Sequence, residues 1–425
     1  MLDVKRIREN PEWVRQGLQA RGASTEAVDA LLRHDEERRR LLAEVETLKS
    51  QRNAASKQIG ELKKKGEDTT AAQTAVREVG DRITALDERV RTTEGETQNV
   101  LLMIPNVPHA SVPVGQSDAA NPVIAQQGTP REFAFTPQSH IELGERLGLF
   151  DFKRAAKMSG AGFALFTGAG ARLQRGLIQY MLDVHTCEHG YMEVWPPALV
   201  TGASMTGTGQ LPKMAEDMYR LAAEELYLIP TAEVPVTNFY REETIEKALP
   251  VLLTAYTPCF RREAGAAGKD TRGLIRLHQF DKVELVKFAT PESSYDELEK
   301  LRADAEDILK RLGLVYRVKS LCTGDLSFAA AKCYDLELWA PGHNGWLEVS
   351  SCSNFEDFQA RRANIRFRDA QGKLRFVHTL NGSGVALPRL VVAILENGQQ
   401  ADGSVVLPPA LVPYMGGVER LVPTA

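Results

Sequence analysis

Residues 259–284 read CFRREAGAAGKDTRGLIRLHQFDKVE, with alternating charged and apolar residues at both ends and glycines between them. This pattern predicts two β-strands joined by a glycine-rich loop that contains Gly265, Gly268 and Gly273. Side chains of a strand alternate between the two faces of a sheet. One face of the hairpin would therefore carry Arg261 and Glu263 from the first strand and Arg276, His278, Phe280, Lys282 and Glu284 from the second.

Such a face combines cations, carboxylates and an aromatic ring, which suits an anionic and planar ligand. Guanidinium groups pair with phosphate, a ring stacks on Phe280, and a carboxylate accepts a hydrogen bond from an exocyclic amine. The alternative is that these charges form only the solvated face of a strand. Two neighbouring strands with the same alternation favour the ligand site.

The segment from about residue 135 onward mixes helical and strand-like stretches without regular β-α-β alternation. The spacing of apolar residues predicts a helix over Arg172–Glu188. It predicts strands over Tyr191–Val200, Leu252–Glu263 and Gly273–Phe288. The pattern indicates an α+β fold with an antiparallel sheet.

The N-terminal quarter is different in character. Residues 1–25 predict one short helix that is capped by Asp3 and ends at Gly22. Two heptad seams then follow, in which successive positions are spaced alternately by four and three residues. The first contains Leu41, Val45, Leu48, Arg52, Ala55, Ile59 and Leu62. The second begins after Gly66 and contains Ala72, Val76, Val79, Ile83, Leu86, Val90, Thr93, Thr97 and Val100. They predict a projecting antiparallel coiled-coil hairpin over about 26–100, within a helical domain over 1–102. A proline-rich connector over 103–130 and a globular domain over 131–425 follow.

One helix of this hairpin is basic near the turn. Between residues 49 and 65 the only acidic residue is Glu61, against the cations Lys49, Arg52, Lys57, Lys63, Lys64 and Lys65. Charge runs on coiled coils are usually solvated surface. Projection together with this polarity favours contact with a nucleic-acid backbone instead.

The composition excludes several classes of protein. Across 425 residues, 52 Lys and Arg stand against 56 Asp and Glu, and this net charge of −4 excludes a protein that coats nucleic acid through bulk positive charge. The five cysteines include no C-x-x-C pair, so neither disulfides nor a zinc site is expected. No apolar run approaches the ~18–20 residues of a membrane span, and the charged N-terminus lacks a signal-peptide core. We therefore expect a cytoplasmic protein.

Three further polar segments have two interpretations each. Arg389 follows Pro388, which fits the first position of a helix, and either binds an anion together with the helix N-terminus or extends into water. The segment from Glu348 to Asn354 offers a carboxylate for Mg²⁺ or forms a serine-rich turn. Thr231-Ala232-Glu233 after an apolar strand has the same ambiguity. The chain has neither a P-loop nor a strand-linked G-x-G-x-x-G motif.

Taken together, these segments resemble the bacterial-type seryl-tRNA synthetases, a family of class II aminoacyl-tRNA synthetases, over essentially the whole chain. Gly190–Pro197 resembles class II motif 1, Phe260–Glu284 motif 2, and Asn381–Arg389 motif 3. Thr231-Ala232-Glu233, His278–Glu284 and Glu348–Ser351 resemble the seryl-type segments. The resemblance implies an antiparallel sheet flanked by helices, a homodimer, and an arm that grips tRNA.

The resemblance also implies roles for individual residues. The expected ATP ligands are Arg261, Arg262, Glu263, Leu277, Phe280, Glu348, Val349, Ser350, Ser351 and Arg389, and Mg²⁺ would be held through ATP by Glu348 and Ser351. The expected serine ligands are Thr231, Ala232, Glu233, Arg261, Glu284, Asn381 and Ser383. Arg261, Arg389 and Glu348 would serve catalysis. The implied activity is the activation of L-serine with ATP and its transfer to tRNA(Ser), and also to tRNA(Sec).

Two alternatives stay open. One is a ligase that loads an amino acid onto a carrier protein. The other is a duplicate synthetase that serves inhibitor resistance or a biosynthetic pathway, because Gly162, Ala164 and Thr167 depart from the family's usual residues. A non-catalytic scaffold would not need the ATP ligands that the chain retains.

Overall fold

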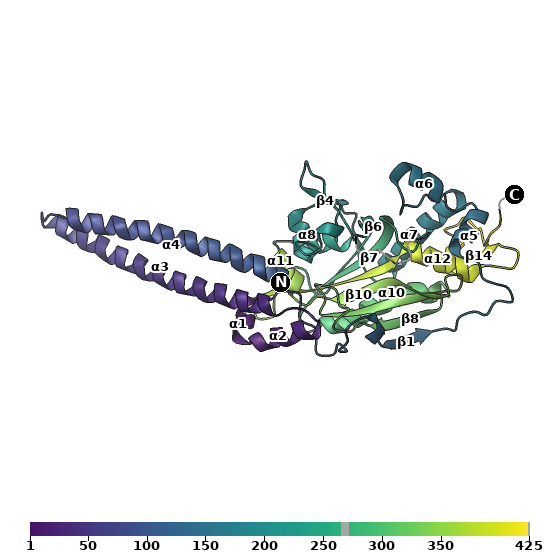
Figure 1. Cartoon of the computed structure of the whole chain (residues 1–425), viewed down its shortest axis with the longest axis horizontal. Coiled ribbons are helices and arrows are strands. Elements are labelled where there is room, and N and C mark those ends of the chain that lie inside the picture. The colour runs from purple at the N-terminus through teal and green to yellow at the C-terminus, as the bar shows by residue number, and fades with distance from the viewer. Residues whose placement is uncertain (265–271, 424–425) are drawn as a thin grey trace. The chain divides into compact units, whose positions relative to one another are not determined.

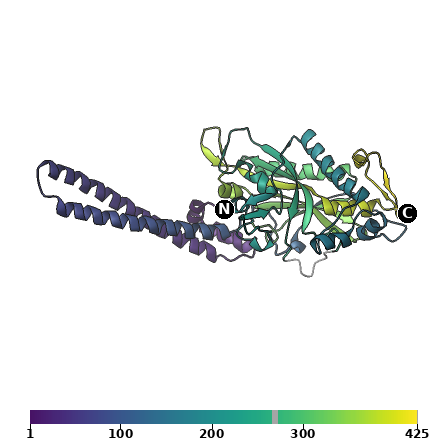
Figure 2. The same cartoon turned by 90° about the horizontal axis from the view of Figure 1, so that it is seen from above.

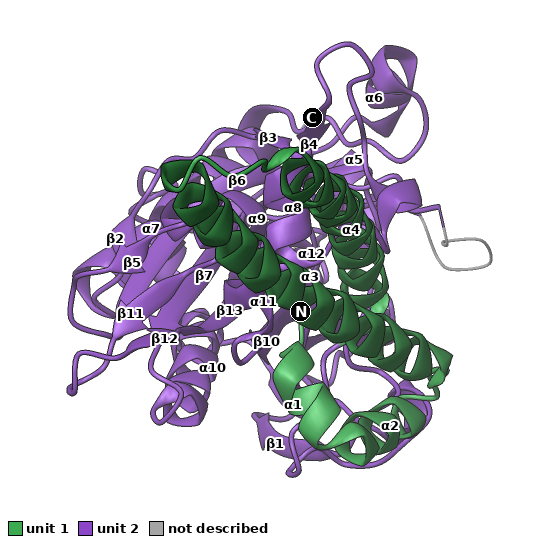
Figure 3. Cartoon of the chain, turned by 90° about the vertical axis from the view of Figure 1, so that its left-hand side faces the viewer, with its two compact units in different colours: residues 1–105 green, residues 106–425 purple. Residues whose placement is uncertain are grey.

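The computed structural model describes residues 1–264 and 272–423, and the predicted loop positions Gly265 and Gly268 lie outside these ranges. Two compact units divide the chain, Met1–Pro105 and Asn106–Ala425 (Figure 3). The division falls close to the expected start of the connector.

The first unit begins with two helices, α1 (Val4–Glu9) and α2 (Pro11–Ala20). Asp3 caps α1 as expected, because its side chain accepts hydrogen bonds from the backbone of Lys5 and Arg6. The prediction of one helix over this region is wrong. Pro11 cannot continue a helix but is well suited to begin one, and the Asn10 side chain caps α2 by accepting from the Trp13 backbone.

The long helices α3 (Glu26–Lys64) and α4 (Thr70–Met103) lie side by side (Figures 1 and 2). Their buried seam contains Leu41, Val45 and Leu48 from α3 and Ile83, Leu86 and Val90 from α4. Ion pairs join Arg38 to Glu94 at 2.8 Å and Lys49 to Asp87 at 3.4 Å, so the helices run in opposite directions. The predicted antiparallel coiled-coil hairpin is confirmed, with Gly66 at φ +76° in its turn.

An eight-stranded sheet forms the centre of the second unit (Figure 1). Its strands, in spatial order, are β1 (Val123–Gln127), β8 (Tyr316–Ser320), β9 (Lys332–Ala340), β10 (Gly345–Asn354), β13 (His378–Ala386), β7 (Gln279–Ala289), β6 (Val251–Phe260) and β2 (Met192–Glu193). Neighbouring strands are antiparallel except β2 and β6, which are parallel. The predicted α+β class with an antiparallel sheet is confirmed.

Shorter elements surround this sheet. Three small sheets pair β12 (Leu374–Phe376) with β11 (Arg366–Arg368) and β5 (Thr244–Ile245), β14 (Val405–Val406) with β15 (Arg420–Leu421), and β3 (Leu199–Thr201) with β4 (Leu226–Leu228). The α-helices are α5 (His140–Arg146), α6 (Phe152–Ser159), α7 (Gly168–Cys187), α8 (Gly202–Thr208), α9 (Glu233–Thr237), α10 (Ser294–Arg311), α11 (Phe358–Ala363) and α12 (Leu387–Gly398). In the described part of the chain, no helix has the length and apolar character that crossing a membrane requires.

The two faces of the sheet have different partners. On β7, Val283 and Leu285 belong to the apolar cluster that includes residues of α7, α10 and α12. The alternating residues Val286 and Phe288 belong to the cluster on the opposite face, with Ala232 and residues of α11. A side chain at Gly384 would meet His185 of α7 at 2.7 Å, so this strand can approach α7 only as glycine. Lys282 and Glu284 share the second face, and Lys282 lines both of its cavities.

Several predicted boundaries are wrong. The stretch Tyr191–Val200 is not one strand, because Pro196 and Pro197 lack N–H donors between β2 and β3. Strand β6 ends at Phe260 and β7 begins at Gln279, so Arg261, Glu263, Arg276 and His278 lie outside the strands that were expected to carry them. Helix α12 begins at Leu387, which makes Pro388 its second residue.

The segment before β7 is held by a buried carboxylate on α12 instead of by strand pairing. Glu396 is fully buried, and its two oxygens accept hydrogen bonds from the backbone of His140, Gly342 and His343 at 2.8–2.9 Å and from His140 Nδ1 at 3.0 Å. His140 Nε2 in turn accepts from the Leu274 backbone at 3.1 Å, so the ring proton lies on Nδ1. Glu396 thereby fixes Leu274 through one histidine.

We expect Glu396→Gln to lower the free energy of unfolding by about 3 kcal/mol. The amide presents an NH₂ group to two N–H donors, and each buried unsatisfied group costs about 1–3 kcal/mol. Urea unfolding measures the change. The control Glu419→Gln alters an exposed carboxylate of the same unit and should change stability by less than about 0.5 kcal/mol. Equal stability of Glu396→Gln and the unmodified chain would contradict the assignment.

Candidate functional site

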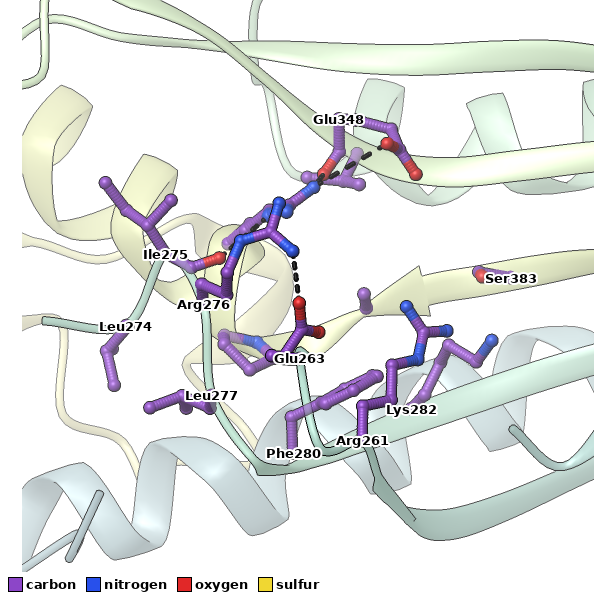
Figure 4. A pocket seen from close by; sticks show the side chains of 14 residues that line it. Arg261, Glu263, Leu274, Ile275, Arg276, Leu277, Phe280, Lys282, Glu348 and Ser383 are labelled. Atoms are coloured by element: carbon purple, nitrogen blue, oxygen red, sulfur yellow. Dashed lines mark hydrogen bonds and ion pairs between the residues drawn. The ribbon is translucent and has the colours of Figure 1, made fainter. Parts of the chain in front are cut away.

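Two adjoining cavities open on the second face of the sheet. The first has a volume of about 190 Å³ and is lined by Arg261, Glu263, Leu277, Phe280, Val349 and Arg389, among others (Figure 4). The second, of about 390 Å³, is lined by Thr231, Glu233, Asp335, Ser351 and Asn381, among others. Arg261, Lys282, Glu348 and Ser383 line both cavities. The structure therefore brings most of the residues selected from the sequence into one continuous site.

The first cavity has an aromatic floor and cationic walls. The Arg261 guanidinium lies 5.1 Å from the centre of the Phe280 ring and donates from Nε to the carbonyl of Pro230. Glu263 has φ +52°, an uncommon conformation for a residue with a side chain, and forms an ion pair with Arg276 (Figure 4). An aromatic face, guanidinium groups and a carboxylate can together bind a base and its phosphates.

Arg389 closes this cavity from α12. Its Nε donates to the carbonyl of Ile275 at 3.1 Å and its Nη1 to the carbonyl of Glu348 at 2.7 Å. The carboxylate of Glu348 lies 3.8 Å away. Both backbone contacts orient the Arg389 guanidinium. Arg389 therefore lies in the first turn of the helix, as expected, and its guanidinium forms part of the cavity wall.

The second cavity contains a buried ion pair. Lys282 Nζ lies 2.5 Å from Glu284 Oε2, and both side chains are less than a tenth exposed. Thr231 Oγ1 donates to Glu284 at 2.8 Å and accepts from Lys282 at 2.9 Å, while Asn381 Nδ2 donates to the other Glu284 oxygen at 3.1 Å. Sequence reasoning assigned no role to Lys282, although period-2 alternation placed it on the same strand face as Glu284.

Glu233 is a second buried carboxylate of this cavity. Burial and the nearby charge of Glu284 raise the pKa of Glu233 to about 7, and hydrogen bonding by Gln359 and the charges of Lys282 and Arg261 oppose the rise. The carboxylate therefore changes charge near neutral pH and would be stabilised in its ionised form by a bound cation.

A third acidic group lies between the cavities. Ser351 Oγ lies within hydrogen-bond distance of both Asp335 Oδ1 and Glu348 Oε1. Burial and the charge of Glu348 raise the pKa of Asp335 to about 8. Two neighbouring carboxyl groups fit a divalent cation, which would stabilise their ionised forms, although no group of three or more His, Cys, Asp or Glu residues in the described ranges could hold a metal by itself. Mg²⁺ typically needs only one or two carboxylates when phosphates supply further ligands.

Some of the predicted ATP and serine ligands, Glu284 among them, line neither cavity. Arg262 is exposed, Ala232 is buried in the apolar cluster on that face, and Ser350 is buried with its Oγ donating to the Ser383 carbonyl at 2.7 Å. His278 Nδ1 donates to the carbonyl of Arg261 at 3.0 Å, and the ring packs against Gly162, where a side chain would meet it at 2.5 Å. Glycine at that departure from the family pattern is thus required by the position of His278.

Two residues that contribute to the second cavity gave no recognisable signal in the sequence. Gln359 contacts Glu233 from α11, and Asp335 contacts Ser351 from β9. Neither belongs to a motif, and only the pairing of β9 with β10 and the packing of α11 bring them near. A lone glutamine in a short helix would have been assigned to packing.

On the first unit, the basic residues fall into two groups. Lys49 pairs with Asp87 of α4, and Arg52 is partly buried. Lys57, Lys63, Lys64 and Lys65 are exposed near the turn between α3 and α4. The second group offers free ammonium charge to an anionic partner.

Comparison with known proteins gives a consistent picture. The family model "tRNA synthetase class II core domain (G, H, P, S and T)" matches residues 218–398, and "Seryl-tRNA synthetase N-terminal domain" matches residues 1–108. The chain is 58% identical to a serine–tRNA ligase of Pelotomaculum thermopropionicum over 99% of this chain and 100% of that protein. It is also 58% identical to that of Geobacillus kaustophilus, over 98% and 99% respectively.

Solved structures agree with these matches. The crystal structure of a seryl-tRNA synthetase from Pyrococcus horikoshii complexed with ATP has a TM-score of 0.95 and 40% identity and covers 100% of both chains. A cytoplasmic serine–tRNA ligase from Naegleria fowleri in complex with AMP has a TM-score of 0.90 and 30% identity, covering 100% of this chain and 99% of that one.

We expect Lys282→Met to lower the free energy of unfolding by about 3–5 kcal/mol, because it leaves Glu284 buried without its counter-charge. Urea unfolding measures the loss. Lys310→Met is the matched control, since Lys310 is half-exposed and its partner Glu306 keeps Arg302. The control should change stability by less than about 1 kcal/mol. A loss for Lys282→Met no larger than the control's would show that the buried pair does not stabilise the fold.

Proposed function

The chain belongs to the seryl-tRNA synthetase family and is an ATP-dependent ligase that joins serine to tRNA, and we propose here how its residues divide this work. The observation that carries the proposal is the continuity of the two cavities through Arg261 and Glu348. The first cavity suits a nucleotide and the second a small zwitterion. The two ligands would react where the cavities meet.

The first cavity would bind ATP. Phe280 stacks on adenine, Glu263 accepts from the adenine amino group, and Arg261 pairs with the α-phosphate. Arg389, oriented by the carbonyls of Ile275 and Glu348, pairs with the γ-phosphate. Leu277 and Val349 supply apolar contacts. Arg262 and Ser350 line neither cavity, so the proposal gives them no direct contact with ATP.

The second cavity would bind serine. Glu233 pairs with the α-ammonium group, and Thr231 and Asn381 lie beside it. Glu284 and Ser383 face the hydroxyl. The buried polar groups of such a site are paired only when the substrate hydroxyl is present. A site of this kind can favour serine over alanine by a factor of about 10⁴ or more. The Lys282 ammonium is the counter-charge of the Glu284 carboxylate, which would accept a hydrogen bond from the serine hydroxyl.

Activation needs no general base, because the serine carboxylate is already a nucleophile. One of its oxygens forms a bond to the α-phosphorus, the bond from that phosphorus to the bridging oxygen breaks, and pyrophosphate leaves. Arg261 is placed to stabilise the charge that develops on the α-phosphate. A ribose hydroxyl of the terminal adenosine of tRNA then attacks the seryl carbonyl, and AMP leaves.

Mg²⁺ would be held by Glu348 and Ser351 together with phosphate oxygens, with Asp335 next to them. Bound there, it would neutralise phosphate charge. The residues fit this role because Asp335 and Glu348 lie together, burial and Glu348 raise the pKa of Asp335 to about 8, and a bound cation would favour the ionised form of both.

An exposed apolar surface on the second unit supports a homodimer. Trp195 is 77% exposed, and Phe239, Met192 and Leu199 are each at least 40% exposed. Trp195, Leu199 and Phe239 line a hollow together with Pro196 and Pro197, in the segment that resembles motif 1. Contiguous apolar surface of this kind usually contacts another protein. We propose that a second copy of the chain covers it.

The remaining assignments rest on family membership alone. They are tRNA(Ser) as the principal tRNA, tRNA(Sec) as a further substrate, and the cytoplasm as the location. The carrier-protein ligase and the specialised duplicate gain no support, since full-length relatives in several organisms are serine–tRNA ligases and the N-terminal tRNA-arm domain is intact.

We expect serine-dependent ATP–pyrophosphate exchange and charging of tRNA(Ser), with only charging dependent on the hairpin. Deleting residues 30–98 should abolish charging and spare exchange. Changing Lys57, Lys63, Lys64 and Lys65 together to Gln should lower kcat/KM for tRNA and reduce its salt dependence, because each lost phosphate contact lowers the salt slope by about 1. Lys247→Gln with Lys373→Gln, both exposed on the second unit, is the control. Full charging by the deletion variant would contradict the arm assignment.

We expect Trp195→Asp to convert the dimer to monomer, because it places a charge in the apolar surface. Sedimentation at micromolar concentrations measures the change in mass. Val114→Asp, which changes a 79% exposed apolar residue elsewhere on the same unit, should leave the mass unchanged. A monomeric unmodified chain would contradict the proposal.

A further inference from the structure

Glu233 is held by a side chain from outside every motif that the sequence revealed. Gln359 of α11 is fully buried, and its Nε2 donates to Glu233 Oε1 at 2.6 Å. The same nitrogen donates to the backbone carbonyl of Thr208 at 3.1 Å. Its amide oxygen accepts from Thr379 Oγ1 at 2.8 Å. All of these partners are buried.

These contacts leave the amide a single orientation. A backbone carbonyl can only accept, so the NH₂ group must face Thr208 and, with it, Glu233. Thr379 completes the arrangement by donating to the amide oxygen. One glutamine thus joins α8, the start of α9 and strand β13, which also carries Asn381 and Ser383 of the same cavity.

We propose that Gln359 is a positioning residue that holds the Glu233 carboxylate in place and in its ionised form for the α-ammonium group of serine. This inference rests on the proposed role of Glu233. Without the amide donor, the Glu233 side chain would be free to rotate away from the cavity. It would also lose a hydrogen bond that favours its charged form over its neutral form.

The charges around Glu233 set the sign of the pH effect. Burial and then the charge of Glu284 raise its pKa, while the hydrogen bond from Gln359 and the charges of Lys282 and Arg261 lower it, and the pKa of about 7 lies above the ordinary 4.5. Pairing with an ammonium group requires the ionised carboxylate, so kcat/KM for serine should fall as the pH drops below about 7. Removing the Gln359 donor raises the pKa further and moves this acid limb to higher pH.

The test compares two inhibitors, a non-hydrolysable seryl-sulfamoyl adenosine and the same compound without its α-amino group. For the unmodified enzyme, the amine-bearing compound should bind more tightly. Gln359→Met, which keeps the volume and removes the donor, should reduce this preference about tenfold, the value of one hydrogen bond to a charged group. The KM for ATP should stay within twofold, and the acid limb of kcat/KM for serine should move upward.

Three further variants separate positioning from simple loss of structure. Gln399→Met removes another buried amide that contacts only backbone carbonyls through its nitrogen and should leave the preference unchanged. Thr379→Val frees the Gln359 amide and should reduce the preference, whereas Thr379→Ser keeps the hydroxyl and should retain it. Should Gln359→Met fail to fold, the Thr379 pair carries the same comparison.

The outcomes distinguish this inference from the proposed function. If the unmodified enzyme binds both compounds equally, the role of Glu233 is wrong and the role of Gln359 falls with it. If the unmodified enzyme prefers the amine but Gln359→Met weakens both compounds by the same factor, Glu233 keeps its role and Gln359 is overturned. An unchanged acid limb in Gln359→Met would likewise overturn it.

Discussion

The buried ion pair between Lys282 and Glu284 is the contact on which the second cavity depends. Burying two charges in a protein interior costs about several kcal/mol per ion unless hydrogen bonds compensate for the lost hydration. Here Thr231 bonds to both partners and Asn381 bonds to the free carboxylate oxygen. The pair can therefore exist only when the Thr231 loop, β7 and β13 are correctly placed. Because Glu233 begins α9 directly after that loop, its position follows from the same pair.

The first cavity has a comparable anchor of its own. Glu396 of α12 holds His140, His140 holds Leu274, and the next residue, Ile275, accepts a hydrogen bond from Arg389 near the start of the same helix. The contacts form a closed circuit that begins and ends on α12. A guanidinium fixed in this way loses little further entropy when it binds phosphate, which is the condition for electrostatic stabilisation of a charged transition state.

Sequence periodicity predicted the coiled coil well because heptad spacing directly reports which residues are buried between two helices. It also predicted that β6 and β7 pair and that Phe280, Lys282 and Glu284 share a face. It failed at Arg276 and His278, because His140, far away in sequence, takes the Leu274 N–H that a strand partner would otherwise bind. Gln359 and Asp335 were missed for the same reason, since their importance comes from the elements packed against them. The periodicity of a short sequence segment indicates how that segment pairs with its neighbours in the chain. The contacts of His140, Gln359 and Asp335 join residues that are far apart in the sequence.

The two carboxylates with raised pKa values have a common cause. Glu233 and Asp335 each lie buried near a second carboxylate, Glu284 and Glu348 respectively. Of the cations in the site, Lys282 pairs with Glu284 and Arg276 with Glu263, whereas Arg261 and Arg389 donate to backbone carbonyls, and none forms an ion pair with Glu233 or Asp335 among the described residues. The site therefore contains more negative charge than its own cations neutralise. The missing positive charge is what the proposed ligands bring, the ammonium of serine beside Glu233 and a divalent cation beside Asp335 and Glu348. Binding of each ligand lowers the pKa of its carboxylate, so at neutral pH the site becomes fully charged only when both are present.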